Sequence, residues 1–319
     1  MKINKNLHKE IINYNLDYIE LLALLNNIKP LVFCTICQAQ KNNLIKLMKK
    51  LNLYYRFVTD PIIEEKSEMS SSEGEFLIIS KEIEKVNNFI NVYFGDNHEK
   101  KFTKVGELLG YPKCCAFKYI NYIFNDGSPQ RLRNYYYQAT KKSQKFHSLI
   151  NPLFSFYGRI SSNEFVKLRS FSEKNKSLNI QELMLISHAP CSFNCIQSIE
   201  YAKKIYSVLK RENKIKANKI IKILSNPVLF FDTFEFIVFN GKANKKEIIY
   251  NNICPPFSLV SDKIIKKIKQ GNRLLVNDVN IQIYIDKKKI YTIKKESVSD
   301  GFIIPFSKNL IKDYGLTHE

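Results

Sequence analysis

The chain has 319 residues, with 50 lysines and arginines against 30 aspartates and glutamates, and seven cysteines. Its 45% of hydrophobic residues can bury a core, which excludes global disorder, and ten glycines and ten prolines exclude a collagen-like chain. Seven cysteines are too few for a disulfide scaffold of this length. The formal charge of +20 favours attraction to polyanions, although abundant Asn, Ile and Lys also fit the residue usage of an AT-rich genome.

The amino-terminal segment has no pattern of a secretory leader. Residues 1–8 are polar, and the apolar stretch after them carries Glu10, Asp17 and Glu20. No run of about 18 uncharged apolar residues occurs in the sequence, so no membrane partner is expected. We therefore expect a cytoplasmic, reducing setting, in which clustered cysteines indicate metal binding or catalysis rather than disulfides.

The first hundred residues alternate between helical and strand patterns. In chain order the expected elements are a helix at 7–28, a strand at 31–36, a helix at 41–51, strands at 53–58 and 76–80, and a helix at 81–91. Residues 66–75 are rich in Ser, Glu and Gly and predict a surface loop. Residues 1–100 are thus expected to form a small α+β unit with a leading helix.

The predicted secondary structure of the rest of the chain changes once, from helical to β-rich. Residues 101–225 are mainly helical in pattern, with a polar break at 172–177. Residues 226–319 carry short β-rich runs separated by Gly, Asn, Asp and Lys, at 227–241, 246–250, 273–278, 281–286 and 288–293. The predicted fold class is α+β, with a helical domain that carries the cysteine motifs between the amino-terminal unit and a β-rich carboxy-terminal unit.

The segment GYPKCC at 110–115 is the first candidate for chemistry. Gly110 is expected to end one helix, and Pro112 suits the first position of the next, where its missing N–H has no cost. Cys114 and Cys115 then lie in the first turn, where free N–H groups and the helix dipole favour thiolate over thiol. Adjacent helical residues point about 100° apart, so one is expected to be a ligand and the other a supporting or reactive thiol. Two buried structural thiols are the alternative.

The segment HAPCSFNC at 188–195 is the second candidate. Pro190 is expected to begin a helix, with Cys191 in its first turn and Cys195 one turn later on the same face. Two thiolates at this spacing suit one tetrahedral metal ion or two corners of an iron–sulfur cluster. A buried stripe containing both cysteines is the alternative.

Three polar residues near the second segment are candidates for supporting roles. His188 precedes the expected helix and is assigned as a ligand or a proton-transfer group. Ser192 and Ser198 are assigned as cofactor-binding residues through hydrogen bonds to the site. Cys115 and His188 are the candidates for catalysis.

The two segments together predict one site. Four of the seven cysteines lie in them, and Cys114, Cys115, Cys191 and Cys195 are the expected metal ligands. An iron–sulfur cluster is preferred as cofactor over zinc. A metal-free thiol site for redox or nucleophilic chemistry and a set of buried structural cysteines remain alternatives.

The remaining cysteines indicate core positions. Cys34 and Cys37 have the spacing of a metal motif, but their segment LVFCTICQ predicts a strand, where residues three apart face opposite sides. The segment also lacks a Gly or Pro to shape a metal knuckle. Cys254 is isolated and is expected to pack in the β-rich unit.

Three lysine-rich stretches raise the question of an anionic partner. They lie at 201–222, at 263–273 and at Lys287–Lys289. An acidic peptide or RNA would fit such surfaces. Solvated helix faces in a lysine-rich protein explain them as well, and this interpretation is preferred.

The two cysteine segments resemble an uncharacterised prokaryotic family, a domain of unknown function. Its pattern is Gly-Tyr-Pro-x-Cys-Cys followed by His-x-Pro-Cys-Ser-x-x-Cys, matched here at 110–115 and 188–195. Residues 226–241 are also similar to a strand pair of that family, so the resemblance covers about 105–250. It implies that both cysteine segments and His188 belong to one site, and it implies no particular activity.

Three functions are consistent with these observations. The first is a cytoplasmic metalloenzyme with a cysteine-ligated metal or iron–sulfur cluster, acting on an unknown small molecule, peptide or RNA. The second is a zinc-stabilised module that binds RNA or protein. The third is a metal-free thiol redox protein. The first is preferred.

Overall fold

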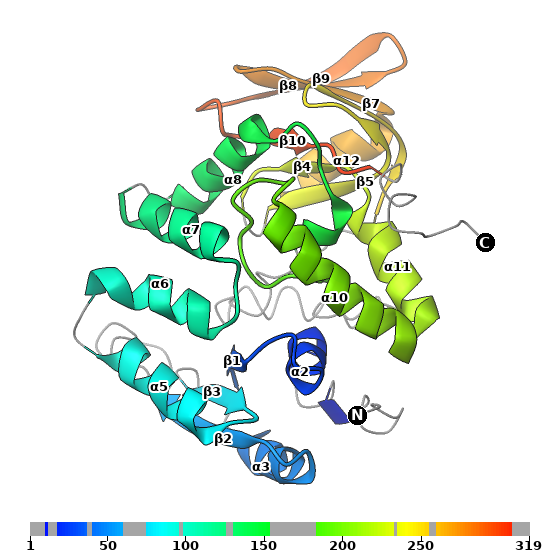
Figure 1. The fold of residues 1–319 in the computed structure, drawn as a ribbon. Helices are drawn as coiled ribbons and strands as arrows, with labels where there is room; N and C mark the ends of the chain where they lie inside the picture. The colour runs from blue at the N-terminus through cyan, green and yellow to red at the C-terminus, as the bar shows by residue number, and fades with distance from the viewer. Residues whose placement is uncertain are drawn as a thin grey trace.

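The computed structural model describes residues 10–11, 18–36, 40–59, 75–95, 98–125, 130–153, 183–232, 235–254 and 260–307. The fold is mixed α+β, as the sequence predicts. In the described part of the chain, helices accompany two antiparallel sheets, one of three strands and one of seven. Figure 1 shows the two sheets at opposite ends of the molecule with helices between them.

The small sheet belongs to the amino-terminal part and has the strand order β1-β3-β2. Its elements are α2 (Tyr18–Leu25), β1 (Leu31–Thr35), α3 (Lys41–Lys50), β2 (Tyr54–Thr59), β3 (Glu75–Ser80) and α5 (Ile83–Phe94). Leu31 and Ile78 pack on one face of the sheet with residues of α5. Val32 and Ile79 join the larger core on the other face. Because neighbouring residues of a strand face opposite sides, coverage of both faces explains the unbroken apolar runs.

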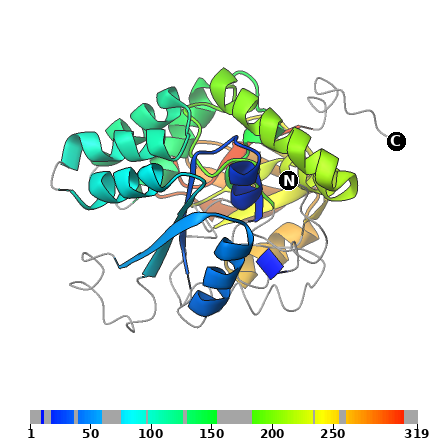
Figure 2. The ribbon, with the colours of Figure 1, turned by 60° about the horizontal axis from the view of Figure 1, so that its bottom comes forward.

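A set of helices connects the two sheets. They are α6 (His98–Leu108), α7 (Lys113–Asn125), α8 (Arg131–Lys142), the short 3-10 helix η2 (Ser148–Ile150), α10 (Ile196–Glu212) and α11 (Lys214–Leu224). In Figure 1, α5 to α8 rise in steps along one side, and α10 and α11 lie on the other. Figure 2 shows these helices as a band above α2 and the small sheet. Helix α10 contacts α2, η2 and α11, so it links the amino-terminal part to the middle of the chain.

The turn between α6 and α7 depends on Gly110. Its φ of +75° is in the left-handed region, and its N–H donates to the carbonyl of Glu107 at 2.9 Å. A Cβ at this position would lie 2.6 Å from Cδ of Pro30, so space and backbone conformation both favour glycine. The glycine ends α6, as expected, and directs the chain into Pro112 and α7.

The large sheet has the strand order β10-β4-β5-β6-β7-β8-β9. Its strands are β4 (Val228–Phe230), β5 (Phe236–Ala243), β6 (Glu247–Ile253), β7 (Arg273–Val276), β8 (Asn280–Ile285), β9 (Lys288–Lys294) and β10 (Phe302–Ile304). Every β-rich run expected from the sequence contributes to it. Helix α12 (Asp262–Gln270) and β10 were not predicted. In α12, Ile265 and Ile268 are buried one turn apart beneath a lysine-rich surface, and the high charge of this segment masks its helical spacing of apolar residues.

One apolar core spans most of the molecule. It includes Leu22 of α2, Tyr136 of α8, Ile205 of α10 and Phe230 of β4. A second core lies on the other face of the large sheet, where Ile268 of α12 packs with strand residues. The first core therefore joins residues from all three units expected from the sequence, whose boundaries at residues 100 and 225 stay predictions.

Several expected features fall partly or wholly outside the described residues. The leading helix is described at 10–11 and at Tyr18–Leu25, and the loop at 66–75 only at its last residue, Glu75, which begins β3. The polar break at 172–177 lies outside the described residues. Among the helices that the structure describes, none is long and apolar enough to cross a membrane.

Candidate metal centre

Cys114 and Cys115 lie in the first turn of α7, as the sequence predicts. The carbonyl of Pro112 accepts hydrogen bonds from the N–H groups of Cys115 at 2.9 Å and Ala116 at 3.0 Å, so the helix begins directly after the proline. Cys115 is buried and Cys114 is partly exposed. Both thiols are thus placed at the positive end of the helix dipole.

The second segment does not form the helix expected from Pro190. Residues 188–195 are a loop, and Cys195 is the N-cap of α10, which begins at Ile196. Side chains from distant residues bind the loop's backbone groups. Lys118 donates to the carbonyl of Cys191 at 2.9 Å, and Tyr135 donates to that of Pro190 at 3.2 Å. These tertiary bonds replace the helical bonds that a local pattern favours.

The four cysteine sulfurs come together despite this difference. The Sγ of Cys195 lies 3.6 Å from that of Cys114 and 3.6 Å from that of Cys115, and the Cys114 and Cys115 sulfurs are 3.9 Å apart. With Cys191, all four ligand atoms lie within 4.8 Å of one another. The expectation that Cys114 and Cys191 are neighbours in space is confirmed. Four cysteines therefore lie close enough to bind a metal.

The thiols influence one another's ionisation. Hydrogen bonds from Cys115 and Cys191 lower the pKa of Cys195 well below its usual value. Hydrogen bonding with Cys191 and Cys195 raises the pKa of Cys115, and burial followed by hydrogen bonding with Cys195 raises that of Cys114 to about 12. Without a cation the cluster thus favours the thiolate at Cys195, while Cys114 and Cys115 hold their protons more tightly than a free cysteine does. A bound cation would remove this restriction.

Ser198 and His188 lie directly behind Cys115. The hydroxyl of Ser198 is 3.1 Å from the sulfur of Cys115 and 2.8 Å from Nε2 of His188. His188 is buried, and burial followed by the positive charge of Lys29 lowers its pKa to about 3. The neutral ring can donate from Nε2 to Ser198, which leaves the hydroxyl proton for the sulfur. Nδ1 of His188 has no hydrogen-bond partner among the described residues.

This geometry distinguishes the roles expected for the polar residues. Ser198 contacts a cysteine sulfur, as a supporting residue should, and His188 is in contact with Ser198 instead of belonging to the group of converging ligand atoms. Ser192 contributes its backbone carbonyl, which accepts from the N–H of Cys195 at 3.2 Å. The cofactor-binding and catalytic assignments of these residues stay predictions.

A buried charge near the centre was missed by the sequence analysis. Lys29 is almost fully buried and forms an ion pair with Glu20 of α2. Its Nζ also donates to Oγ of Ser187 at 3.3 Å and lies 4.8 Å from the ring centroid of Tyr111. Ser187 precedes the second cysteine segment, and Tyr111 belongs to the first. The burial of Lys29 could not be predicted from the local sequence, because its partners come from three separate parts of the chain.

The other described cysteines lie elsewhere. Cys34 is in β1, where its sulfur is 3.8 Å from the carbonyl oxygen of Leu77. The sulfur of Cys254 is 3.6 Å from Nδ2 of Asn226 beside the main core. Neither belongs to the converging group, and Cys37 lies outside the described residues.

Comparisons with protein-family models, curated proteins and solved structures gave no match to this chain. The resemblance to the uncharacterised prokaryotic family therefore stays a prediction. The function has to be argued from the donor set, which consists of four sulfurs with two buried and two partly exposed members. Thiolates of this kind suit zinc, a single iron or an iron–sulfur cluster.

Proposed function

We propose that Cys114, Cys115, Cys191 and Cys195 bind one zinc ion, and that the protein is a zinc-stabilised binding module. The observation that carries this proposal is the spacing of 3.6–3.9 Å among the sulfurs of Cys114, Cys115 and Cys195. A tetrahedral zinc with bonds of about 2.3 Å needs sulfurs about 3.8 Å apart. The remaining distances in the group, all within 4.8 Å, need only small side-chain movements to reach that arrangement.

The same spacing argues against the cluster that the sequence analysis preferred. Each cysteine of a four-iron cluster binds a different iron, which separates the sulfurs by roughly 6 Å. In this centre all four ligand atoms lie within 4.8 Å of one another. A four-iron cluster would therefore require the two cysteine segments to move apart. A single ion fits without that movement.

A closed tetrathiolate site acts mainly through stability. The metal would join the first turn of α7 to the N-cap of α10, and Cys114 and Cys195 are 81 residues apart in sequence. No such site exists in the unfolded chain, so the free energy of metal binding contributes to folding. Lys118 places positive charge beside the centre through its hydrogen bond to the Cys191 carbonyl.

The exposure of Cys114 favours a second candidate, the metalloenzyme preferred from the sequence. A catalytic zinc site keeps three protein ligands and an open position. Cys114 is partly exposed, and its sulfur lies 3.3 Å from Oε1 of Gln197, which is exposed at the surface. Release of Cys114 would give an open corner lined by Cys115, Cys191 and Cys195. In that case Cys114→Ser would retain the metal and Cys195→Ser would lose it.

Metal analysis of anaerobically purified protein tests the proposal. The expected result is one zinc per chain, no acid-labile sulfide and no colour, with visible absorption bands typical of tetrahedral thiolate ligation after substitution by cobalt. A brown protein containing iron and sulfide would overturn the zinc proposal in favour of the cluster. Protein without metal that forms a reversible disulfide between the two segments would overturn it in favour of the thiol redox protein.

A further inference from the structure

The exposed face of α10 carries a row of basic side chains. Lys204, Lys210 and Arg211 follow Lys203 by one, seven and eight positions, which places all four on one side of a helix with 3.6 residues per turn. Lys203, Lys204 and Arg211 are exposed and Lys210 is half-buried. The opposite side of α10 is buried, and its buried members include Ile199, Ala202, Ile205, Tyr206 and Leu209. The row is therefore a defined surface feature, because the buried side fixes which way the helix faces.

Helix α11 extends this surface beyond the end of α10. Asn213 is the one residue between the helices, and its side chain caps α11 by accepting from the N–H of Lys216 at 3.0 Å. Lys214, Lys219 and Lys222 are exposed on α11. The two helices contain Glu200 and Glu212 as their acidic residues, and Glu212 is paired with Arg211. The net charge of this surface is therefore strongly positive.

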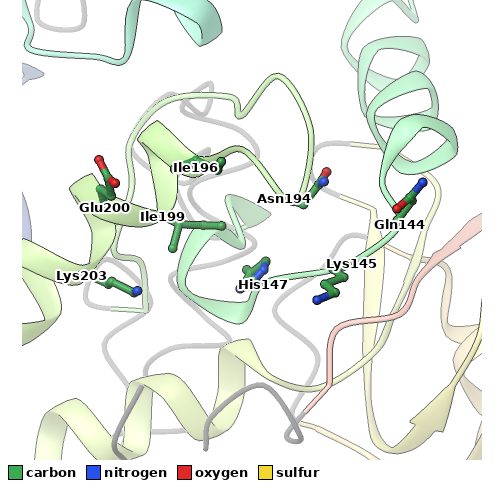
Figure 3. Close-up of a pocket in the computed structure, with 8 residues that line it drawn as sticks. All are labelled: Gln144, Lys145, His147, Asn194, Ile196, Ile199, Glu200 and Lys203. Atoms are coloured by element: carbon green, nitrogen blue, oxygen red, sulfur yellow. The ribbon is translucent and has the colours of Figure 1, made fainter. Parts of the chain in front are cut away.

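A hollow of about 450 Å³ opens at the amino-terminal end of the same row. Figure 3 shows Lys203 and Glu200 on one side of it and Lys145 on the other, with Ile196, Ile199 and His147 between them. Lys203 belongs to both the hollow and the row. Ile196 is 71% exposed, so the hollow has an apolar wall that faces solvent. It combines positive charge, apolar surface and one carboxylate.

We propose that α10, α11 and this hollow bind single-stranded RNA. The basic row contacts successive phosphates, since the 17 residues of α10 span about 25 Å, which is several nucleotides. An unstacked base enters the hollow against His147 and the two isoleucines. Glu200 would repel a phosphate there, but its carboxylate can accept a hydrogen bond from a ribose 2′-hydroxyl, which favours RNA over DNA.

The composition of the row argues against other anionic partners. Docking on a lipid surface requires apolar side chains among the lysines. Between Lys203 and Arg211 the exposed positions on this side of α10 hold Ser207 and basic residues. The exposed isoleucines of the two helices, Ile196 and Ile215, lie before and after this stretch, so binding to anionic vesicles is the direct test of the lipid alternative. A duplex would present no free base to the hollow. An acidic peptide would pair with the lysines, but its carboxylates would form no favourable interaction with the carboxylate of Glu200.

The basic row and the hollow share no residue with the metal centre, but the centre lies next to one wall of the hollow. Cys195 immediately precedes Ile196, so a metal ion at the centre would fix the wall of the hollow. The inference does not rest on the zinc proposal, because the row and the hollow consist of other residues. The binding experiment therefore uses the full chain as purified, with its metal content measured for every variant.

A matched pair of triple variants separates this surface from net charge. Lys203→Gln, Lys204→Gln and Lys210→Gln together remove three charges from the row, and Lys287→Gln, Lys288→Gln and Lys289→Gln remove three from the exposed turn at the start of β9. Fluorescence anisotropy with a labelled single-stranded RNA is measured over a series of salt concentrations. The row variant is expected to bind at least about tenfold more weakly, with a salt slope reduced by about 2, and the turn variant is expected to bind as wild type.

Several outcomes would overturn the proposal. Equal losses in the two triple variants would show that only net charge matters. Equal or tighter binding of duplex DNA, of anionic phospholipid vesicles or of polyglutamate would reject single-stranded RNA as the partner. Binding of single-stranded DNA as tightly as RNA of the same sequence would reject the role of Glu200. If that role is correct, Glu200→Ala reduces the preference for RNA over DNA while circular dichroism and metal content stay unchanged.

Discussion

The two cysteine segments place their sulfurs at the same point in space with different backbone conformations. In the first, Pro112, Cys114 and Cys115 follow the local pattern, and their helix starts where the sequence predicts. In the second, Pro190 and Cys191 lie in a loop, and only Cys195 reaches a helix, as its N-cap. A similar local signal therefore gave a helix start at one site and a loop at the other.

The difference lies in the partners of the backbone. In the first segment the carbonyl of Pro112 accepts from N–H groups three and four residues later. In the second, the carbonyls of Pro190 and Cys191 accept from Tyr135 and Lys118, and the N–H of Phe193 donates to Ser143 at 2.7 Å. Distant side chains can thus outweigh a helix-start pattern, because each backbone group needs only one good partner. The second segment therefore depends on tertiary contacts, and perturbations should affect it more.

The largest expected effect comes from the residue that joins the two segments. Cys195→Ser removes the thiolate that contacts both Cys114 and Cys115. We expect bound zinc to fall from one ion per chain to almost none, with a loss of several kcal/mol of unfolding free energy, because metal binding is coupled to folding. Metal stoichiometry and chemical unfolding with and without chelator measure both quantities.

Cys34→Ser is the control for that substitution, since Cys34 is also partly buried but lies in β1 away from the centre. Its metal content should match wild type. Retention of zinc by Cys195→Ser, or equal destabilisation with and without chelator, would show that the centre does not bind metal through Cys195.

The next largest effect is expected at Lys29, which contacts Tyr111 of the first segment and Ser187, the residue before the second segment. Lys29→Met leaves the carboxylate of Glu20 buried without its ion-pair partner, which costs about 3–5 kcal/mol. Lys50→Met is the matched control, because Lys50 pairs with Glu10 at an exposed position and should contribute about 0–1 kcal/mol. Chemical unfolding measures both.

A double variant tests the reason for that loss. Lys29→Met with Glu20→Gln removes both charges of the buried pair and should recover much of the stability lost in Lys29→Met. If the double variant is as unstable as the single one, the lysine acts through its contacts with the cysteine segments instead of through charge compensation.

The parts of the structure that could be predicted from the sequence are those determined by residues near one another in the chain. In β6, β7 and β8 buried residues alternate with more exposed ones, and the start of α7 depends on its own proline and glycine. The convergence of the four cysteines was also predictable, since two similar motifs implied one site. In contrast, the buried Lys29 network depends on residues from α2, the α6–α7 turn and the loop before α10, and no local pattern records it.

A smaller effect is expected for the hydroxyl behind Cys115. Ser198→Ala removes a hydrogen bond to the Cys115 sulfur, and loss of such a partner lowers metal affinity by about 10–100-fold. Ser192→Ala is the control, because the backbone carbonyl that Ser192 offers to Cys195 is retained in alanine. Competition with a zinc chelator gives both affinities. Equal affinities for the two variants would mean that Ser198 does not support the ligand.

The smallest effect is a pH dependence carried by His188. Burial, followed by the charge of Lys29, lowers its pKa in the folded protein to about 3, below the ordinary value of 6.5. Between these two values the unfolded chain binds a proton that the folded chain does not, so stability rises with pH. As pH falls below about 6.5, this group should therefore remove about 1.4 kcal/mol of stability per pH unit.

His188→Gln should abolish that part of the slope, whatever its effect on stability at neutral pH. Wild type and variant share the cysteines, whose protonation also changes metal binding, so the difference between their slopes isolates the histidine. Unfolding free energies from pH 7 down to about pH 5 provide the comparison. An unchanged slope in His188→Gln would mean that His188 is protonated in the folded protein, and it would remove the neutral donor assigned to Ser198.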